Sequence, residues 1–321
     1  MNIYLTLDYE LFMGSVSGSV QNCLIKPMNR LVERTQNLGV LFTLFVDAAY
    51  LFKLSEFKNH NPKLQEDYDC IVNNLRDLVG KGHSIQLHIH PQWYYSTFAD
   101  GQWRIDQSHY KLSDIPISDV QNLFDASKKH LESIIGKKVT AFRAGGYSIQ
   151  SLGGYAKFLH ENGINVDSSV ASGQKYLSGF QWYDYSKVKG GKTYRFSDDV
   201  LKEDKDGRMI EYPISSIHIT TFRYILYRLY VKYFKSVGVV FGDGKAVPST
   251  QKVNLFTIRV MNYSFDYVMA PMLYSVFRKL KNKGYNDIII IGHPKNQSEE
   301  SIEELRRFVE KSSQIAKFRI I

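Results

Sequence analysis

Polar residues that could do acid–base or metal chemistry recur at the ends of short apolar runs. Asp8 and Glu10 close the first run, and His88 and His90 close another. Alternate side chains on a strand point the same way, so each pair is expected to share a face. Burying so many ionisable groups unpaired would be costly, so the coincidence favours one common site. Three later runs are also followed by ionisable residues, namely Arg143, Asp167 and His293.

Glu10, His88 and His90 form a set that suits a divalent metal ion. Catalytic zinc typically takes three protein ligands from histidine and carboxylate side chains and leaves one position for water. The metal lowers the pKa of that water and polarises a carbonyl group. We therefore expect a divalent cofactor at these three residues, with Zn²⁺ as the best match.

Asp8 and His293 are the candidates for proton transfer. Asp8 lies two residues before a predicted metal ligand and suits a general base, whereas His293 suits the acid that protonates a leaving amine. Arg143 is expected to keep Asp8 ionised, since a nearby cation favours the carboxylate. These roles together suit hydrolysis of an amide.

The elements that carry these residues follow an alternating pattern of strand-like and helix-like segments, which predicts an α/β fold with a parallel sheet. In such folds chemistry sits where the carboxyl ends of the strands meet. About seven strands favour a barrel over an open sheet, formed as a single domain over 1–321 with inserted loops. The expected strands are 3–7, 40–46, 84–89, 139–142, 164–166, 209–215 and 288–291. The expected helices are 26–38, 64–79, 120–135, 152–161, 221–235, 265–283 and 301–312.

Composition narrows the class of protein. Of 321 residues, 44% are hydrophobic and 23% charged, as in soluble globular proteins. The net charge of +9 comes from scattered Lys and Arg without a nucleic-acid motif, so no nucleic-acid partner is expected. Cys23 and Cys70 imply no disulfide framework, and the N-terminus lacks the features of a signal peptide. We expect a cytoplasmic protein, and a peripheral place on the inner face of a membrane is the alternative.

Five segments of the chain resemble, in order, the five motifs of the polysaccharide deacetylase family, also called carbohydrate esterase family 4 or the NodB-like homology domain. The likeness runs over nearly the whole chain, and its specificity comes from the ordered set rather than from any one motif. The segments are 5–10 (LTLDYE), 82–91 (GHSIQLHIHP), 142–147 (FRAGGY), 166–169 (VDSS) and 290–294 (IIGHP).

The resemblance implies a distorted (β/α) barrel, a divalent metal, and release of acetate from an N-acetylated sugar or glycan. It implies that Asp8 is the base and His293 the acid, and that Arg143 and Asp167 support the two ends of this pair. It also implies that the backbone N–H near Tyr147 helps to hold the oxyanion.

Three positions depart from the family pattern. Tyr9 stands where the family usually has a metal-binding aspartate, and Gln92 stands where its second histidine usually lies. Glu10 and His90 are therefore the expected replacements as ligands. The sequence 145–146 is Gly-Gly, where the third motif usually has proline.

Two segments bear on the substrate. In the loop after His90, Trp93 and Tyr94 are expected either to stack on a sugar ring or to cover the barrel mouth. An inserted aromatic and basic segment spans about 218–250. Its part 221–235 is predicted to pack on the barrel as an amphipathic helix, and contact with a membrane that carries a lipid-linked glycan is the less favoured alternative.

Three function classes follow from these residues. The first is a metal-dependent deacetylase of a sugar or glycan precursor. The second is a hydrolase of a non-sugar amide or an O-acetyl ester on the same scaffold. The third is a non-catalytic glycan-binding protein, which Tyr9 and Gln92 would explain as a decayed metal site.

Overall fold

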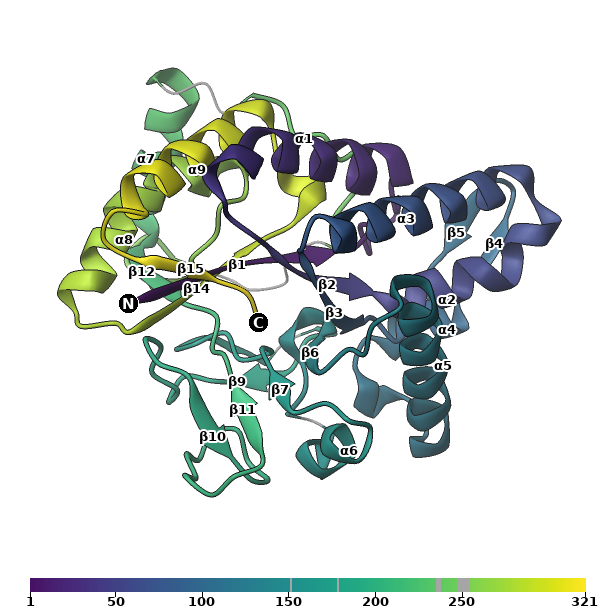
Figure 1. Ribbon diagram of the computed structural model, residues 1–321. Helices are drawn as coiled ribbons and strands as arrows, with labels where there is room; N and C mark the ends of the chain where they lie inside the picture. Colours follow the sequence, from purple (N-terminus) through teal and green to yellow (C-terminus); the bar gives the residue numbers. More distant parts are fainter. Residues whose placement is uncertain (151, 178, 235–237, 248–253) are drawn as a thin grey trace.

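The fold is built on one curled, mostly parallel sheet (Figure 1). The computed structural model describes residues 1–150, 152–177, 179–234, 238–247 and 254–321. Along the sheet the order is β10 (Tyr194–Phe196), β11 (Met209–Glu211), β7 (Val166–Asp167), β6 (Ala141–Ala144), β3 (Ser84–Ile89), β2 (Thr43–Asp47), β1 (Asn2–Tyr9) and β14 (Asp287–Gly292), and β15 (Lys317–Arg319) also pairs with β1.

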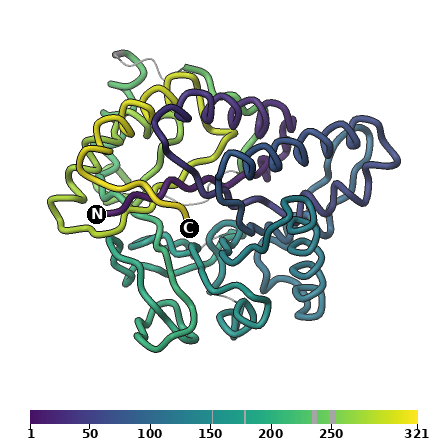
Figure 2. The backbone as a smooth tube through the Cα atoms, in the orientation of Figure 1, coloured from purple at the N-terminus to yellow at the C-terminus, as the bar shows by residue number. Residues whose placement is uncertain are grey.

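The seven strands from β11 to β14 run parallel, and β10 is an antiparallel edge. Ile214, just after β11, bridges Ile289 of β14, so the two ends of the sheet curl towards each other. The predicted α/β barrel of about seven parallel strands is therefore confirmed. The C-terminal strand β15 runs parallel beside the N-terminal strand β1 (Figure 2).

Apolar strands and amphipathic helices account for this architecture. The four isoleucines of β14 are all buried, as expected for a parallel strand covered on both faces. Around the sheet, α1 packs against α9, and α2, α3 and α5 form a second group of helices (Figure 1). The helices are α1 (Lys26–Thr35), α2 (Ala48–Phe57), α3 (Pro62–Gly80), α4 (Gln92–Tyr95), α5 (Ile117–Ile135), α6 (Tyr155–Glu161), α7 (Thr221–Phe234), α8 (Leu273–Asn282) and α9 (Glu299–Ser312).

Several elements differ from the sequence-based expectation. Helix α2 was not predicted; the side chain of Asp47 caps it by accepting a hydrogen bond from Tyr50 N–H. The helix expected over 265–283 begins as a 3₁₀ turn that contains Pro271, and only from Leu273 is it α-helical. The expected loop after His90 contains α4 and a small hairpin, β4 (Thr97–Ala99) with β5 (Gln102–Arg104).

The insertion is an antiparallel pair, β12 (Ser216–Thr220) and β13 (Ile258–Asn262), with α7 at its far end. The expected helix 221–235 is thus observed up to Phe234; Lys235 and 248–250 lie outside the described residues. The limits of the insertion, about 218–250, stay a prediction. None of the described helices is both long and apolar enough to span a membrane.

Candidate active site

The carboxyl ends of β1, β3 and β14 open into a cavity of about 310 Å³. This is the edge of the sheet at which parallel α/β folds carry their chemistry. The cavity contains five of the predicted site residues, Asp8, Glu10, His88, His90 and His293, and Tyr147 also lines it.

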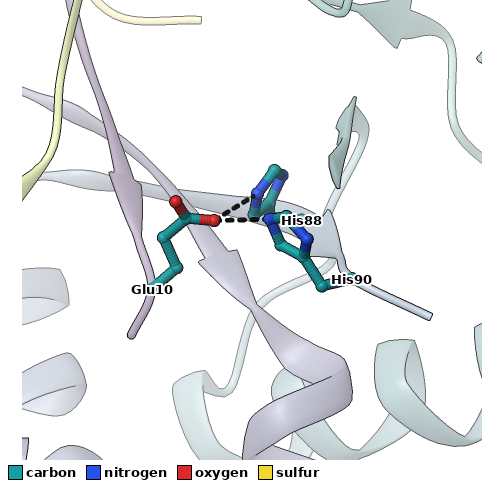
Figure 3. A group of neighbouring side chains, drawn as sticks. All are labelled: Glu10, His88 and His90. Carbon is teal, nitrogen blue, oxygen red and sulfur yellow. Dashed lines mark hydrogen bonds and ion pairs between the residues drawn. The ribbon is translucent and has the colours of Figure 1, made fainter. Parts of the chain in front are cut away.

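Glu10, His88 and His90 converge in this cavity (Figure 3). One ligand atom from each lies within 4.8 Å of the other two, and all three side chains are buried. Oε2 of Glu10 is 3.0 Å from Nε2 of His88 and 2.6 Å from Nε2 of His90. Two imidazole nitrogens and a carboxylate oxygen are a donor set that catalytic zinc accepts, so the residues present fit a divalent metal.

The histidines differ in what holds their rings. Nδ1 of His88 lies 2.7 Å from the carbonyl oxygen of Arg143, which fixes the tautomer that leaves Nε2 free to bind a metal. Nδ1 of His90 is buried and has no hydrogen-bond partner within the described ranges. Beside it, a Cβ at Gly145 would lie 2.7 Å from that nitrogen, so the departure from proline in the third motif leaves space for the His90 ring.

A lysine that the sequence did not suggest enters this site. Nζ of buried Lys295 lies 2.8 Å from Oε1 of Glu10 and 2.7 Å from the carbonyl oxygen of Leu11. Burial would raise the pKa of Glu10, but Lys295 and His90 hold it well below its usual range. Glu10 is therefore an anion that faces the histidines with one oxygen and an ammonium group with the other.

Arg143 holds Asp8 as the sequence predicts. Its Nη1 donates to Oδ1 of Asp8 at 2.6 Å, and the guanidinium is fully buried. The remaining donors bind Thr6 Oγ1, Ser168 Oγ and the Ser168 carbonyl oxygen. The ring of Phe45 lies against its face at 4.1 Å. These contacts hold the guanidinium in one position, so Arg143 orients the Asp8 carboxylate.

His293 lies beside both carboxylates of the first motif. Its Nε2 is 3.7 Å from Oδ2 of Asp8 and 3.9 Å from Oε1 of Glu10. Its Nδ1 lies 2.7 Å from Oδ2 of Asp266, and its backbone N–H donates to Oδ1 of the same residue. Burial lowers the pKa of His293, but Asp266 and Asp8 outweigh this and raise it.

Asp167 does not support His293, which corrects the role implied by the resemblance. The hydroxyl of Ser169 donates to Oδ1 of Asp167, and Asp167 lies beside Glu211 in the interior. Burial raises the pKa of Asp167 to about 6 and holds that of Glu211 well above its usual range. Oδ2 of Asp167 and Oε2 of Glu211 lack a donor in the described structure, so a shared proton would satisfy both. The fourth motif reaches the site through Ser168.

Trp93 cannot stack on a sugar, because its side chain is fully buried and its indole N–H donates to Oδ2 of Asp47 at 2.8 Å. Tyr94 does not line the cavity; its ring packs on Tyr95, and its carbonyl oxygen accepts from Lys53. Both residues therefore pack outside the cavity, and the second expected role, a cover over the barrel mouth, stays a prediction.

Tyr147 lines the cavity, with its hydroxyl accepting from Asn262. Its φ of 62° is an uncommon conformation for a bulky residue, of the kind that functional sites retain. Whether its backbone N–H holds an oxyanion stays a prediction.

Part of the aromatic lining of the cavity comes from a segment for which the sequence predicted no element. Phe180 is 43% exposed and stacks on Tyr110, with ring centroids 6.1 Å apart. Tyr176 and Phe12 also line the cavity. Phe180 lies between β8 (Lys175–Tyr176) and β9 (Tyr183–Asp184), a hairpin too short to show strand periodicity.

The two replaced ligand positions point away from the metal group. The hydroxyl of Tyr9 donates to Asn74 of α3 at 3.0 Å. Gln92 is fully buried and does not line the cavity. Glu10 and His90, the expected replacements, are the residues that face it.

Sequence reasoning missed Asp266 and Lys295. Asp266 follows β13 closely, and Ser264 bridges Ile291 of β14. A carboxylate just after a strand could have been recognised as a candidate site residue. It was not, because the helical pattern of 265–283 hides the end of the strand. Lys295 stands two residues after His293, but nothing in its spacing distinguishes it from a surface lysine.

No protein-family model matches the chain, and no curated protein matches it. Solved structures do. A protein of Mycobacterium smegmatis assigned as a polysaccharide deacetylase has 14% identity and a TM-score of 0.55, over 99% of this chain and 86% of that one. The PuuE allantoinase has 11% identity and a TM-score of 0.52, over 99% and 87%.

A branching enzyme of glycoside hydrolase family 57 from Thermococcus kodakaraensis has 12% identity and a TM-score of 0.50, over 100% of this chain and 69% of that one. Proteins with different names thus share this architecture, and identities this low indicate fold alone. The chain therefore has the distorted (β/α) barrel fold that is found among polysaccharide deacetylases.

Proposed function

We propose that this protein is a metal-dependent hydrolase that removes the N-acetyl group from a sugar or a glycan precursor. The observation that carries the proposal is the convergence of Glu10, His88 and His90 within 4.8 Å, beside Asp8 and His293, in one cavity. Amide hydrolysis needs an activated water, a base and an acid at one point.

Glu10, His88 and His90 would hold the divalent metal, and Zn²⁺ suits the donor set. When bound, this ion supplies an acidic water and polarises the acetyl carbonyl. Asp8, held in place by Arg143, takes the proton from the attacking water. His293, held through Nδ1 by Asp266, gives the proton from Nε2 to the leaving amine.

The substrate class is proposed from the rim of the cavity. Phe180 presents an exposed ring at the mouth, backed by the buried ring of Tyr110, and the apolar face of a sugar can pack on such a surface. The names of the structurally similar deacetylases agree with a glycan substrate.

Metal content and acetate release test the proposal together. The purified protein should bind about one equivalent of zinc or cobalt, and acetate should be released from one of a panel of N-acetyl sugars, glycans and nucleotide sugars. His88→Ala should lose both metal and activity. His160→Ala is the matched control, because His160 is outside the cavity and bonds Asn165. Equal metal content in the two variants would refute the ligand assignment.

Lys295 gives a reason to keep the non-catalytic glycan-binding alternative. Its ammonium group lies beside the Glu10 carboxylate and balances the charge of that carboxylate, so this buried carboxylate does not require a metal as its counter-ion. A protein that takes up no added zinc, cobalt, nickel or iron and still binds N-acetyl sugars would favour this alternative. Acetate release from non-sugar amides or acetyl esters, but not from sugars, would favour a hydrolase of another substrate class.

A further inference from the structure

The outer face of α7 is apolar, whereas a helix on a soluble protein normally presents polar residues to solvent. Large apolar side chains at spacings of three and four residues share this face, and each is between 39% and 69% exposed. They are Phe222, Ile225, Leu226, Leu229, Tyr230 and Tyr233.

A different face of α7 attaches it to the protein. Val231 is 1% exposed, and the hydroxyl of Tyr227 donates to the carbonyl oxygen of Val268 at 2.8 Å. Tyr224 packs under the guanidinium of Arg259 at 4.8 Å. The packing predicted for this helix therefore uses its inner face only, and the outer face stays exposed at the edge of the molecule (Figure 1).

The end of the loop before β13 and the first residue of that strand extend the exposed face. Leu255 and Phe256 of the loop are 51% and 88% exposed, and Ile258 of β13 is 62% exposed. This loop lies against the start of α7, because Phe222 N–H donates to the carbonyl oxygen of Leu255 at 2.9 Å. We call these three residues and the six on α7 the apolar ridge. Exposed apolar patches of this kind mark interaction sites.

Basic residues border the apolar ridge. By helical periodicity Arg223 lies on one side of it, and Arg228 and Lys232 lie on the other; all three are exposed. Helix α7 contains no acidic residue. An apolar stripe with aromatic rings between two basic borders is the pattern of a helix that lies in the plane of a membrane surface.

We propose that the apolar ridge inserts into the surface of a membrane that contains anionic lipids. The apolar side chains enter the boundary between headgroups and acyl chains, and the three cations contact lipid phosphates. This surface is separate from the candidate active site and does not depend on the proposed reaction.

Flotation with vesicles tests this proposal on the full chain. We expect the protein to float with vesicles of phosphatidylcholine that contain roughly a third phosphatidylglycerol, more weakly with phosphatidylcholine alone, and more weakly at high salt. The variant Leu226→Gln/Leu229→Gln/Phe256→Gln should lower the partition coefficient at least about tenfold. Arg223→Gln/Arg228→Gln/Lys232→Gln should lose the preference for anionic vesicles.

A matched control separates insertion from general stickiness. Ile117, Leu201 and Ile315 are 66%, 37% and 43% exposed elsewhere on the surface. Replacing these three by Gln should leave flotation unchanged. Equal flotation of the ridge and control variants, or no flotation of the unaltered protein, would overturn the proposal. So would a dimer of the unaltered protein that the ridge variant dissociates, because a second copy would then cover the ridge.

Fluorescence gives a readout that does not depend on how well the triple variant folds. Phe256→Trp places one probe on the ridge, and Ile117→Trp places the control probe elsewhere. Brominated lipids in anionic vesicles should quench the added emission of the first variant and not that of the second. Quenching that is equal in both variants would count against insertion of the ridge.

Discussion

Nζ of Lys295 lies 2.8 Å from Oε1 of Glu10, while Oε2 of the same carboxylate faces His88 and His90. A lysine cation and the proposed metal ion would therefore share one carboxylate. The two cations repel each other, and the low dielectric of a buried site strengthens this repulsion.

Lys295→Met should tighten metal binding. Removing the competing cation should lower the dissociation constant for Zn²⁺ or Co²⁺ about tenfold, equivalent to about 1.4 kcal/mol. Competition against a chromophoric chelator measures this constant without an activity assay. Lys295→Arg keeps the charge and is the control. Weaker binding in the Met variant would instead mean that Lys295 positions Glu10.

Asp266→Asn should reduce kcat about 100-fold with little change in KM, because the side chain holds the proposed acid and not the substrate. Asp266 also contributes to the raised pKa of His293, so its loss should lower that pKa. The protonated acid would then be lost at lower pH, and the alkaline limb of the pH–rate profile should move to lower pH. Asp204→Asn, at a residue that does not line the cavity, should leave the profile in place. An unmoved alkaline limb in Asp266→Asn would refute the role.

Trp93→Phe should destabilise the folded protein and leave KM unchanged. The change removes the N–H that donates to Oδ2 of buried Asp47. Loss of this hydrogen bond should lower the free energy of unfolding by about 1–3 kcal/mol. Urea denaturation measures the loss. Trp182→Phe is the control, since that ring is 44% exposed. A large rise in KM for Trp93→Phe would instead support the predicted contact of Trp93 with the sugar.

Phe180→Ala should change KM and leave the stability of the folded protein nearly unchanged, the opposite of Trp93→Phe. Its ring is half exposed at the cavity mouth, so the change should raise KM roughly tenfold and hardly affect the free energy of unfolding. Steady-state kinetics on the best substrate of the panel provide the measurement. An unchanged KM would show that the substrate does not reach the hairpin between β8 and β9.

Relative to the unaltered protein, Glu211→Gln should have a free energy of unfolding that increases as the pH rises. The pKa of Glu211 is raised in the folded protein, so the folded state keeps a proton that the unfolded state releases above about pH 4.5. The stability of the unaltered protein should therefore fall with pH across this window, by up to about 1.4 kcal/mol per unit. The Gln variant keeps a donor towards Asp167 and avoids this loss.

Urea denaturation at pH 5 and pH 8 compares the two proteins. Glu161→Gln is the control, because Glu161 is exposed and its charge should add little. Parallel pH dependence of the unaltered protein and Glu211→Gln would contradict a shared proton.

Strand periodicity predicted much of the barrel because parallel strands buried on both faces leave long apolar runs, such as 288–291. The same alternation placed Asp8 and Glu10 on one face, and both line the cavity. Residues at strand ends could thus be predicted together, although the strands lie far apart in sequence.

The unpredicted parts depend on contacts that carry no periodic signal. Asp266 reaches His293 only because Ser264 bridges β14, and Phe180 stands on a hairpin with two-residue strands. Trp93 was given a contact with sugar because an aromatic residue near a metal ligand resembles a binding residue. Its indole N–H instead donates to Asp47 at the end of β2, a contact that no periodicity predicts.

The register of β12 and β13 has a consequence for where the chain can work. Asn262, at one end of this pair, holds the Tyr147 hydroxyl at the cavity, and Ile258, four residue steps or about 13 Å away, belongs to the apolar ridge. A short two-stranded pair therefore joins the two surfaces. If both proposals hold, a chain docked on lipid through the apolar ridge would keep its cavity close to the bilayer, and would act on acetyl groups tethered there more readily than on freely diffusing ones.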